Sequence, residues 1–152
     1  MKLSMAAEFA VRGILCLAEE YGHGPLPLDK ICRRRKLRKE YLTKIFGLLA
    51  RANLVDAVRG KGGGYALSRS PAMISLLDVI EAVEGPLALN LCQHTPPKCD
   101  EPGCRVRPVW TDLQERIRSV LSSKTLDQLI QEAPNRDTSR FGDHAADPGA
   151  PG

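Results

Sequence analysis

Residues 39–67, KEYLTKIFGLLARANLVDAVRGKGGGYAL, contain the pattern that decides the fold of this chain. In the first half, Leu42, Ile45, Phe46 and Leu49 recur at i, i+3, i+4 and i+7, which predicts an amphipathic helix over residues 39–52. The second half predicts two short strands, residues 54–59 and 65–67, because each is apolar and a glycine-rich turn separates them. A helix followed directly by a β-hairpin is therefore expected.

Two further helices are predicted upstream of this segment. Residues 5–21 carry apolar side chains at near-helical spacing and stop at a glycine and proline turn, residues 22–25. Residues 28–35 form a second, shorter amphipathic pattern, and only a few residues separate it from the helix at 39–52. A short connection of this kind is what a helix-turn-helix requires. The order of three helices and a hairpin predicts a mainly α protein with a winged helix-turn-helix.

Downstream, the chain predicts three more helices and one irregular loop. Ser75 and Asp78 form a capping-box pattern that begins a helix ending at Gly85. A loop rich in cysteine and proline follows, and then a long helix from about residue 108 to 121. One face of this long helix is apolar: Val109, Trp110, Leu113, Ile117, Val120 and Leu121. Thr125 and Gln128 begin a last short helix.

The net charge of +4 is unevenly placed, and residues 30–44 form a basic block in which Glu40 is the only acidic residue. Local positive charge suits a polyanion such as DNA, although basic runs are also found on solvated helix faces. A recognition helix presents its first residues to base edges, and basic residues beside the hairpin turn can reach phosphates or a minor groove. The predicted DNA contacts are Arg38, Lys39, Glu40, Tyr41, Thr43, Lys44, Arg59 and Lys61.

Three cysteines, Cys92, Cys99 and Cys104, lie close together in the loop with the spacing C-x6-C-x4-C. Thiolates select zinc, copper(I) or iron–sulfur clusters. The gaps fit neither the paired spacing of zinc sites nor that of bacterial ferredoxins, so an iron–sulfur cluster, zinc and a thiol redox switch all remain open. His94 is a further candidate ligand, whereas Cys16 and Cys32 are expected to be structural thiols within helices.

The 152-residue chain contains no apolar run of the roughly 20 residues needed to cross a bilayer, and its first residues lack a secretory pattern. A cytoplasmic protein with reduced thiols and no membrane association is therefore expected. No pairing of a nucleophile with a base is visible, so the sequence predicts neither an enzyme nor a small-molecule substrate.

The turn Arg59-Gly-Lys-Gly-Gly-Gly-Tyr65 resembles the wing signature of the IscR-type regulators, also called the Rrf-two family. Residues 40–46, 74–83 and 104–110 are similar to the family's recognition helix, the segment after its wing and the entry to its dimerisation helix. The resemblance implies a homodimeric transcription regulator that binds operator DNA. It also implies a 2Fe–2S or 4Fe–4S cluster on the three loop cysteines, which would sense cluster supply, iron, nitric oxide or redox state.

On this basis we divide the chain into a DNA-binding domain, residues 1–70, a cluster-binding loop with a dimerisation helix, residues 71–133, and a tail, residues 134–152. The tail is expected to be disordered because it is rich in Pro, Gly, Asp, Ser and Ala. Two other functions stay open: a cluster-free DNA-binding regulator with a thiol or zinc switch, and an iron–sulfur carrier or electron-transfer protein.

The resemblance leaves the fourth cluster ligand to be assigned. The IscR subgroup has a histidine three residues after the last cysteine, where this chain has Arg107, which cannot act as a ligand at ordinary pH. The nitric-oxide-sensing subgroup takes a carboxylate from the first helix of the other subunit, and Glu8 occupies that position here. Glu8 is therefore the predicted fourth ligand, with His94, water or a small thiol as alternatives.

Overall fold

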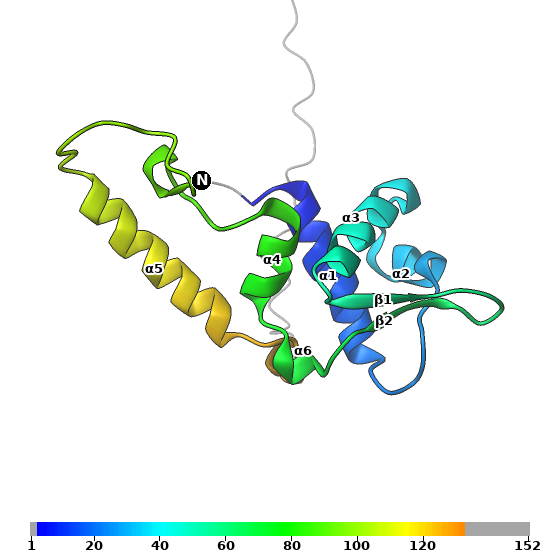
Figure 1. The fold of residues 1–152 in the computed structure, drawn as a ribbon. Helices are drawn as coiled ribbons and strands as arrows, with labels where there is room; N and C mark the ends of the chain where they lie inside the picture. The colour runs from blue at the N-terminus through cyan, green and yellow to red at the C-terminus, as the bar shows by residue number, and fades with distance from the viewer. Residues whose placement is uncertain (1–2, 133–152) are drawn as a thin grey trace, which may run out of the picture.

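The computed structural model describes residues 3–132, which form six α-helices, two 3-10 turns and one β-hairpin (Figure 1). The elements are α1 (Met5–Glu19), α2 (Leu28–Arg35), α3 (Lys39–Arg51), β1 (Val55–Val58), β2 (Gly64–Leu67), η1 (Pro71–Met73), α4 (Leu76–Glu84), η2 (Leu91–Gln93), α5 (Arg107–Ser123) and α6 (Leu126–Gln131). The predicted mainly α architecture with a two-stranded hairpin is confirmed. The expected disordered tail lies outside the described residues.

Helix α1 is central to the fold, because α2, α3, α4, α6 and β2 all pack against it. Ser4 caps its N-terminus, where Ser4 Oγ accepts a hydrogen bond from the Ala7 N–H at 3.1 Å. The helix ends at Glu19 and not at Tyr21 as the apolar spacing suggested, and Tyr21 is half exposed in the turn that follows. The turn begins early because Gly22 has a positive φ of 87°, which no helix can continue.

Helix α3 buries the four residues that its sequence pattern selects, Leu42, Ile45, Phe46 and Leu49, against α1 and α4. Lys36, in the left-handed conformation with φ 54°, ends α2, and Arg38 in extended conformation precedes α3. Between them, Leu37 is buried and its N–H bonds to the carbonyl oxygen of Cys32. This tight connection gives α2 and α3 the helix-turn-helix arrangement.

The hairpin pairs β1 with β2 antiparallel, in the register Val55↔Leu67 to Val58↔Gly64. Gly64 lies so close to Leu26 that an added Cβ would stand 2.3 Å from the Leu26 carbonyl oxygen. Leu26 also forms two main-chain hydrogen bonds with Tyr65, at 2.8 and 2.9 Å. The last glycine of the turn is therefore needed to seat the hairpin against the segment that leads into α2.

Helices α4 and α6 begin side by side, each with the predicted capping box. The Leu76 N–H bonds to Lys124 O at 2.8 Å, and the Leu126 N–H bonds to Ile74 O at 2.9 Å. Leu126 is fully buried and brings α6 onto the core that α1 organises. The short final helix thus fastens the far end of α5 to the helical domain (Figure 1).

Helix α5 runs from Arg107 to Ser123, two residues longer at its C-terminal end than predicted, and no residue of it is buried. Its predicted apolar face therefore lies outside the core of the single chain. Figure 1 shows α5 on the opposite side of α4 from the hairpin. No helix among residues 3–132 is long and apolar enough to cross a membrane.

Candidate DNA interface and cysteine loop

The outward face of α3 is polar and exposed. Arg38 precedes the helix and Lys39, Glu40, Tyr41, Thr43 and Lys44 follow on its first turns, and all of these predicted contacts are exposed. The Thr43 hydroxyl donates to the carbonyl oxygen of Lys39 at 2.8 Å, an internal helix contact that leaves its own lone pairs open. The structure therefore brings the predicted contacts on α3 together on one surface.

Three cations of the basic block are ion-paired rather than free. Arg34 and Arg35 of α2 reach back to acidic residues at the end of α1, with Arg34 Nη2 at 2.7 Å from Glu20 Oε1 and Arg35 Nη2 at 2.6 Å from Glu19 Oε1. The hydrogen bond from Arg34 lowers the pKa of Glu20. These partners lie outside residues 30–44, so counting charges within the block overstated its positive charge.

Lys39 is the third paired cation, with its Nζ at 2.8 Å from Asp29 Oδ1 of α2. In contrast, no ion pair within residues 3–132 involves Arg38, Lys44, Arg59 or Lys61. Arg59 and Lys61 are exposed on either side of Gly60 at the tip of the hairpin. These four predicted DNA contacts, which have no ion pair in the described structure, thus lie at the start of α3 and at the tip of the hairpin.

Tyr41, which is exposed on α3, also contacts α1. Its ring packs edge-on against the ring of Phe9 of α1, with the centroids 5.5 Å apart. Met5 and Phe9 of α1 line one side of a groove, and Tyr41 and Lys44 of α3 line the other. Glu8 lies on the same end of α1, exposed, with its Oε2 3.8 Å from Arg12 Nη2.

The two helical cysteines are structural, as expected. Cys16 is fully buried, and its Sγ accepts a hydrogen bond from Arg35 Nε at 3.0 Å. Cys32 packs against the core, and burial raises the pKa of its thiol. Neither residue takes part in the loop that follows α4.

The three loop cysteines are all free and half-buried, with Cys92 in the turn η2 and Cys99 and Cys104 in the irregular segment after it. Within residues 3–132 the structure does not bring three His, Cys, Asp or Glu side chains to metal-binding distance. The predicted ligands Cys92, Cys99, Cys104 and Glu8 are therefore not gathered in the single chain. Their chemistry nevertheless fits a soft metal centre, because three thiols share one short loop.

Arg107 lies at the position where the IscR subgroup has a histidine ligand, and its side chain makes a structural contact. Its Nη2 donates to the carbonyl oxygen of Glu101 at 3.2 Å, and its own N–H bonds to Cys104 O at 3.3 Å. His94 is half-buried directly after η2. Arg107 thus closes the last part of the loop onto the start of α5.

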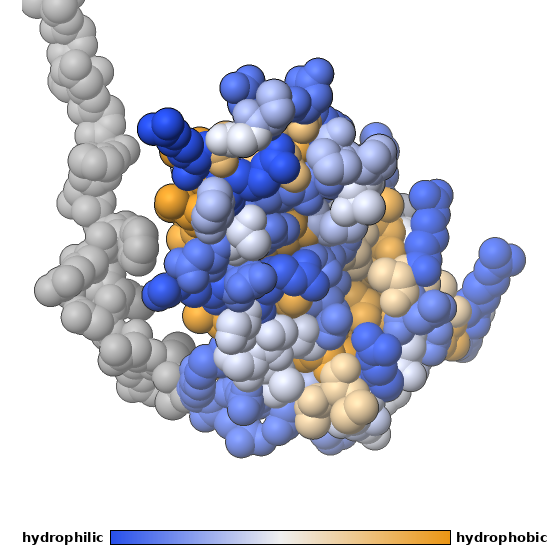
Figure 2. Space-filling view, turned by 60° about the vertical axis from the view of Figure 1, so that its left-hand side comes forward, coloured by the Kyte–Doolittle hydropathy of each residue, from blue (hydrophilic) through white to orange (hydrophobic). Residues whose placement is uncertain are grey.

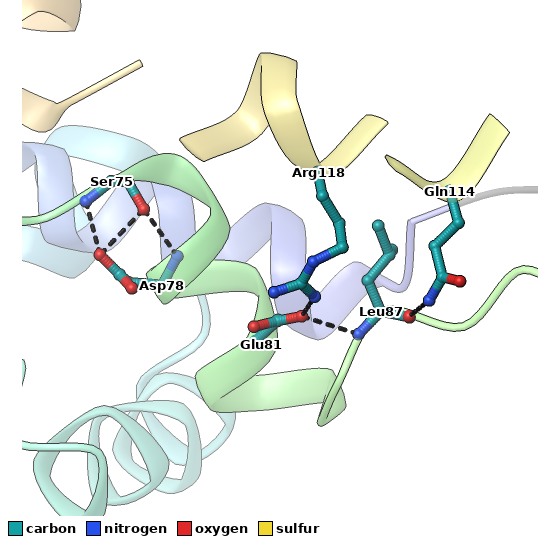
Figure 3. Close-up of polar contacts among 6 residues, drawn as sticks. All are labelled: Ser75, Asp78, Glu81, Leu87, Gln114 and Arg118. Atoms are coloured by element: carbon teal, nitrogen blue, oxygen red, sulfur yellow. Dashed lines mark hydrogen bonds and ion pairs between the residues drawn. The ribbon is translucent and has the colours of Figure 1, made fainter. Parts of the chain in front are cut away.

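Sequence patterns did not single out a set of polar residues that attach the beginning of the loop to its neighbouring helices. Leu87 forms hydrogen bonds with Glu81 of α4 and Gln114 of α5, and Arg118 of α5 bonds to the same Glu81 carboxylate (Figure 3). In the sequence, only the i, i+4 spacing of Gln114 and Arg118 beside the apolar face of α5 could have indicated this attachment. That signal is weak, since solvated helix faces show it equally well.

Large apolar residues are exposed along α5 and at its start. Val106, Val109 and Val120 have exposed fractions of 55%, 62% and 64%. Figure 2 brings this side of the molecule forward and shows hydrophobic patches at the surface among polar residues. The predicted apolar face of α5 is therefore divided: Val109 and Val120 are exposed, whereas Ile117 and Leu121 line a pocket with Ile80 of α4.

A helix-turn-helix with an exposed basic face, a two-stranded wing and a long C-terminal helix define this protein as a winged helix-turn-helix DNA-binding protein. A protein-family model described as "Rrf2: Iron-dependent Transcriptional regulator" matches residues 3–132. The chain belongs to the Rrf2 family of transcriptional regulators. Its relatives are regulators rather than enzymes, which confirms that expectation.

Individual relatives agree with this assignment. The regulator IscR of Xenorhabdus nematophila is 35% identical over 131 residues, which cover 86% of this chain and 80% of that protein. The solved structure of T. potens IscR has a TM-score of 0.70 at 32% identity, covering 88% of each chain. CymR, the global cysteine regulator of B. subtilis, has a TM-score of 0.74 at 29% identity, covering 86% of this chain and 97% of its own.

Proposed function

We propose that this regulator is a cytoplasmic homodimer whose affinity for operator DNA is set by an iron–sulfur cluster on Cys92, Cys99 and Cys104. The observation that carries the proposal is the state of these thiols: all three are free, half-buried and confined to one loop between α4 and α5. Structural cysteines are usually packed into a core, as Cys16 is here. The relatives named IscR support the same class of cofactor.

A dimer built on α5 would complete the molecule. The exposed valines of this helix lie on a face that nothing covers among the described residues, and two-fold DNA readers commonly dimerise through a long helix. Symmetric pairing would place two copies of α3 at a fixed separation. That separation would have to match the spacing of two operator half-sites.

Glu8 is our candidate for the fourth ligand, supplied by the partner's α1. Its carboxylate is exposed and held only by an i, i+4 pair with Arg12, which is weak enough to be exchanged for a metal. When bound, the cluster would supply a redox-sensitive link between the loop of one protomer and the first helix of the other. Because α1 packs against α3, a change at Glu8 would reach the DNA-binding surface.

The proposal is tested by anaerobic purification followed by iron and sulfide quantification and visible absorption. We expect a coloured protein, and we expect Cys92→Ala, Cys99→Ala and Cys104→Ala each to remove the colour, whereas Cys32→Ala keeps it. Glu8→Ala should load iron but lose it faster to a chelator. A colourless wild-type protein that contains zinc and no iron would overturn the proposal.

A second function is a cluster-free regulator that uses the same thiols as a zinc site or redox switch. It rests on one observation, namely that Cys92, Cys99 and Cys104 are free thiols on one loop, which can bind zinc or be oxidised to a disulfide. The similarity to CymR, a cysteine regulator by name, is compatible with this alternative. Zinc analysis and thiol counting before and after oxidation separate it from the cluster model. Membership in a regulator family favours both over an iron–sulfur carrier.

A further inference from the structure

The segment that runs from the end of α4 through the first loop cysteine, residues 85–93, which we call the strap, is tied to helices on both sides. The Leu87 N–H donates to Glu81 Oε1 of α4 at 2.9 Å, and the Leu87 carbonyl oxygen accepts from Gln114 Nε2 of α5 (Figure 3). Both main-chain polar groups of Leu87 are therefore satisfied by side chains from two different helices. This double attachment fixes the path of the strap as it leaves α4.

The same Glu81 carboxylate also holds α5 directly, because Arg118 Nη1 bonds to the Oε1 atom that Leu87 uses. The Glu81 side chain is 25% exposed, the least of the ion-paired carboxylates among the described residues. A partly buried carboxylate with two donors forms stronger bonds than an exposed surface pair. One side chain thus joins α4, the strap and α5.

The strap has a second attachment at its other end, beside Cys92. Gln93 Oε1 accepts from the N–H groups of Leu89 and Asn90 at 2.9 and 3.2 Å, and Gln93 Nε2 donates to the Trp110 carbonyl oxygen of α5. Trp110, Gln114 and Arg118 are spaced i, i+4 and i+8, so the two attachments lie along one face of α5. Cys92, inside the turn η2, is held between them.

The rest of the loop is attached differently. Between residues 94 and 105, the hydrogen bonds in the described structure run from Lys98 N to Leu91 O, from Arg107 N to Cys104 O and from Arg107 Nη2 to Glu101 O. These contacts close the loop onto its own two ends and reach neither α4 nor the middle of α5. Cys99 and Cys104 therefore lie on an arm whose hydrogen bonds reach only Leu91 and the first residue of α5, Arg107.

We propose that Glu81, Gln114 and Arg118 are positioning residues that hold Cys92 in place on α5, and that cluster assembly closes the arm with Cys99 and Cys104 onto it. The cluster part of this inference rests on the proposed function, whereas the fixed strap does not. Because α4 packs against α1 and α3, Glu81 also links the loop to the DNA-binding helices. Releasing Glu81 is expected to make DNA affinity insensitive to the cluster.

The variants can be graded by what each removes. Glu81→Gln keeps an acceptor for Leu87 but loses the ion pair, Glu81→Ala loses both, and Arg118→Met loses the pair alone. The matched control is Arg116→Met, which removes a cation from the same helix whose Nε pairs with the exposed Asp112 Oδ2 at 2.9 Å. This control makes no contact with the strap in the described structure.

The first measurement is hydrogen exchange by mass spectrometry on the protein without a cluster. Amides of residues 87–93 should exchange about tenfold faster in Glu81→Ala, less so in Glu81→Gln, and at the wild-type rate in Arg116→Met. Slow exchange in residues 42–49 verifies that each variant is folded, and the near-isosteric Glu81→Gln keeps the test valid if Glu81→Ala unfolds. Unchanged exchange of the strap in Glu81→Gln and Arg118→Met would overturn the inference.

The second measurement is retention of iron against a chelator after anaerobic reconstitution. Loss of a residue that orients a metal ligand typically weakens binding by about tenfold or more, so Arg118→Met should release iron correspondingly sooner than Arg116→Met. Faster strap exchange with unchanged iron retention would overturn the positioning role while leaving the proposed function intact. A wild-type protein that takes up no iron would instead contradict both the proposed function and the closure of the arm. The hydrogen-exchange data would still test whether Glu81 and Arg118 hold residues 87–93 in place.

Discussion

Lys39, the first residue of the recognition helix α3, is ion-paired to Asp29 in the first turn of α2, with 2.8 Å between Lys39 Nζ and Asp29 Oδ1. The pair spans the helix-turn-helix connection and holds a cation of the exposed α3 surface in a contact within the protein. The sequence predicts that Lys39 contacts DNA. The ion pair distinguishes it from Lys44, which is exposed on the same helix without one in the described structure.

The first prediction concerns the number of phosphate contacts made by these two lysines. Lys44→Met should reduce the slope of log affinity for DNA against log salt by about 1, because one released counterion is lost. Lys39→Met should change the slope less, while Asp29→Asn should free Lys39 and steepen it by up to about 1. Fluorescence anisotropy titrations over a range of salt measure these slopes. Equal decreases of the salt slope in Lys39→Met and Lys44→Met would show that DNA displaces Asp29 from Lys39.

The second prediction is the pH range over which the Asp29–Lys39 pair persists. The hydrogen bond and charge of Lys39 lower the pKa of Asp29, and those of Asp29 raise the pKa of Lys39. The stabilisation from Asp29 is present above its unfolded-state pKa and is lost as pH falls through the lowered folded value. The stabilisation from Lys39 is present below its unfolded-state pKa and is lost as pH rises through the raised folded value.

The stabilisation from the pair should therefore be fully present between about pH 5 and 9 and decline outside that range. Carbon NMR titration of the Asp29 carboxyl group measures the lower limit directly. In Lys39→Met the midpoint should move back toward the ordinary aspartate value. A midpoint that does not move would show that the pair is absent in solution.

The third prediction uses two glycines on facing helices. A Cβ at Gly13 of α1 would lie 2.8 Å from Phe46 Cε2, so Gly13→Ala should overpack the α1–α3 contact and destabilise the fold by about 1–3 kcal/mol. Gly47 of α3 has nothing within 4 Å of the same position, so Gly47→Ala should stabilise by about 0.5–1 kcal/mol through helix propensity. Urea unfolding measures the change in the free energy of unfolding for each variant. Changes of the same sign would contradict the packing described for the two glycines.

The fourth prediction addresses the exposed face of α5. A charge on a desolvated interface is strongly unfavourable, so Val109→Glu combined with Val120→Glu should raise the dimer dissociation constant by about tenfold or more. Met73→Glu is the control, because Met73 of η1 is equally apolar and 69% exposed but lies off α5. Sedimentation velocity separates the species. A dimer that survives the double change would place the interface elsewhere.

The fifth prediction concerns the tip of the wing. Arg59→Gln should weaken DNA binding, because the side chain is exposed and no ion pair in the described structure holds it. If it contacts phosphate, the loss should be similar on all DNA sequences and the salt slope should fall by about 1. If it contacts bases, the loss should depend on sequence. Binding to operator and scrambled duplexes distinguishes the two, and unchanged affinity on both would exclude a contact.

The chain alone was sufficient to predict its secondary structure, because local signals carry it. The spacing of Leu42, Ile45, Phe46 and Leu49 selects one buried face of α3, and the capping residues Ser75 and Thr125 begin α4 and α6 where expected. The glycine turn likewise predicts the hairpin. Two helix ends were misplaced by two residues, because α5 continues to Ser123 and α1 stops at Glu19. The prediction at Tyr21 was wrong because the apolar spacing continued up to the backbone break at Gly22.

What the sequence determined, then, is the list of elements, the exposed basic face and the three thiols of one loop, since each depends on residues close together in the chain. Only the tertiary structure decided which charges are free, because the partners of Arg34 and Arg35 come from another helix. It also decided that Arg107 supports the loop and that Glu81 ties Leu87 to α5. Such contacts join residues far apart in sequence, and their geometry exists only once the helices have packed.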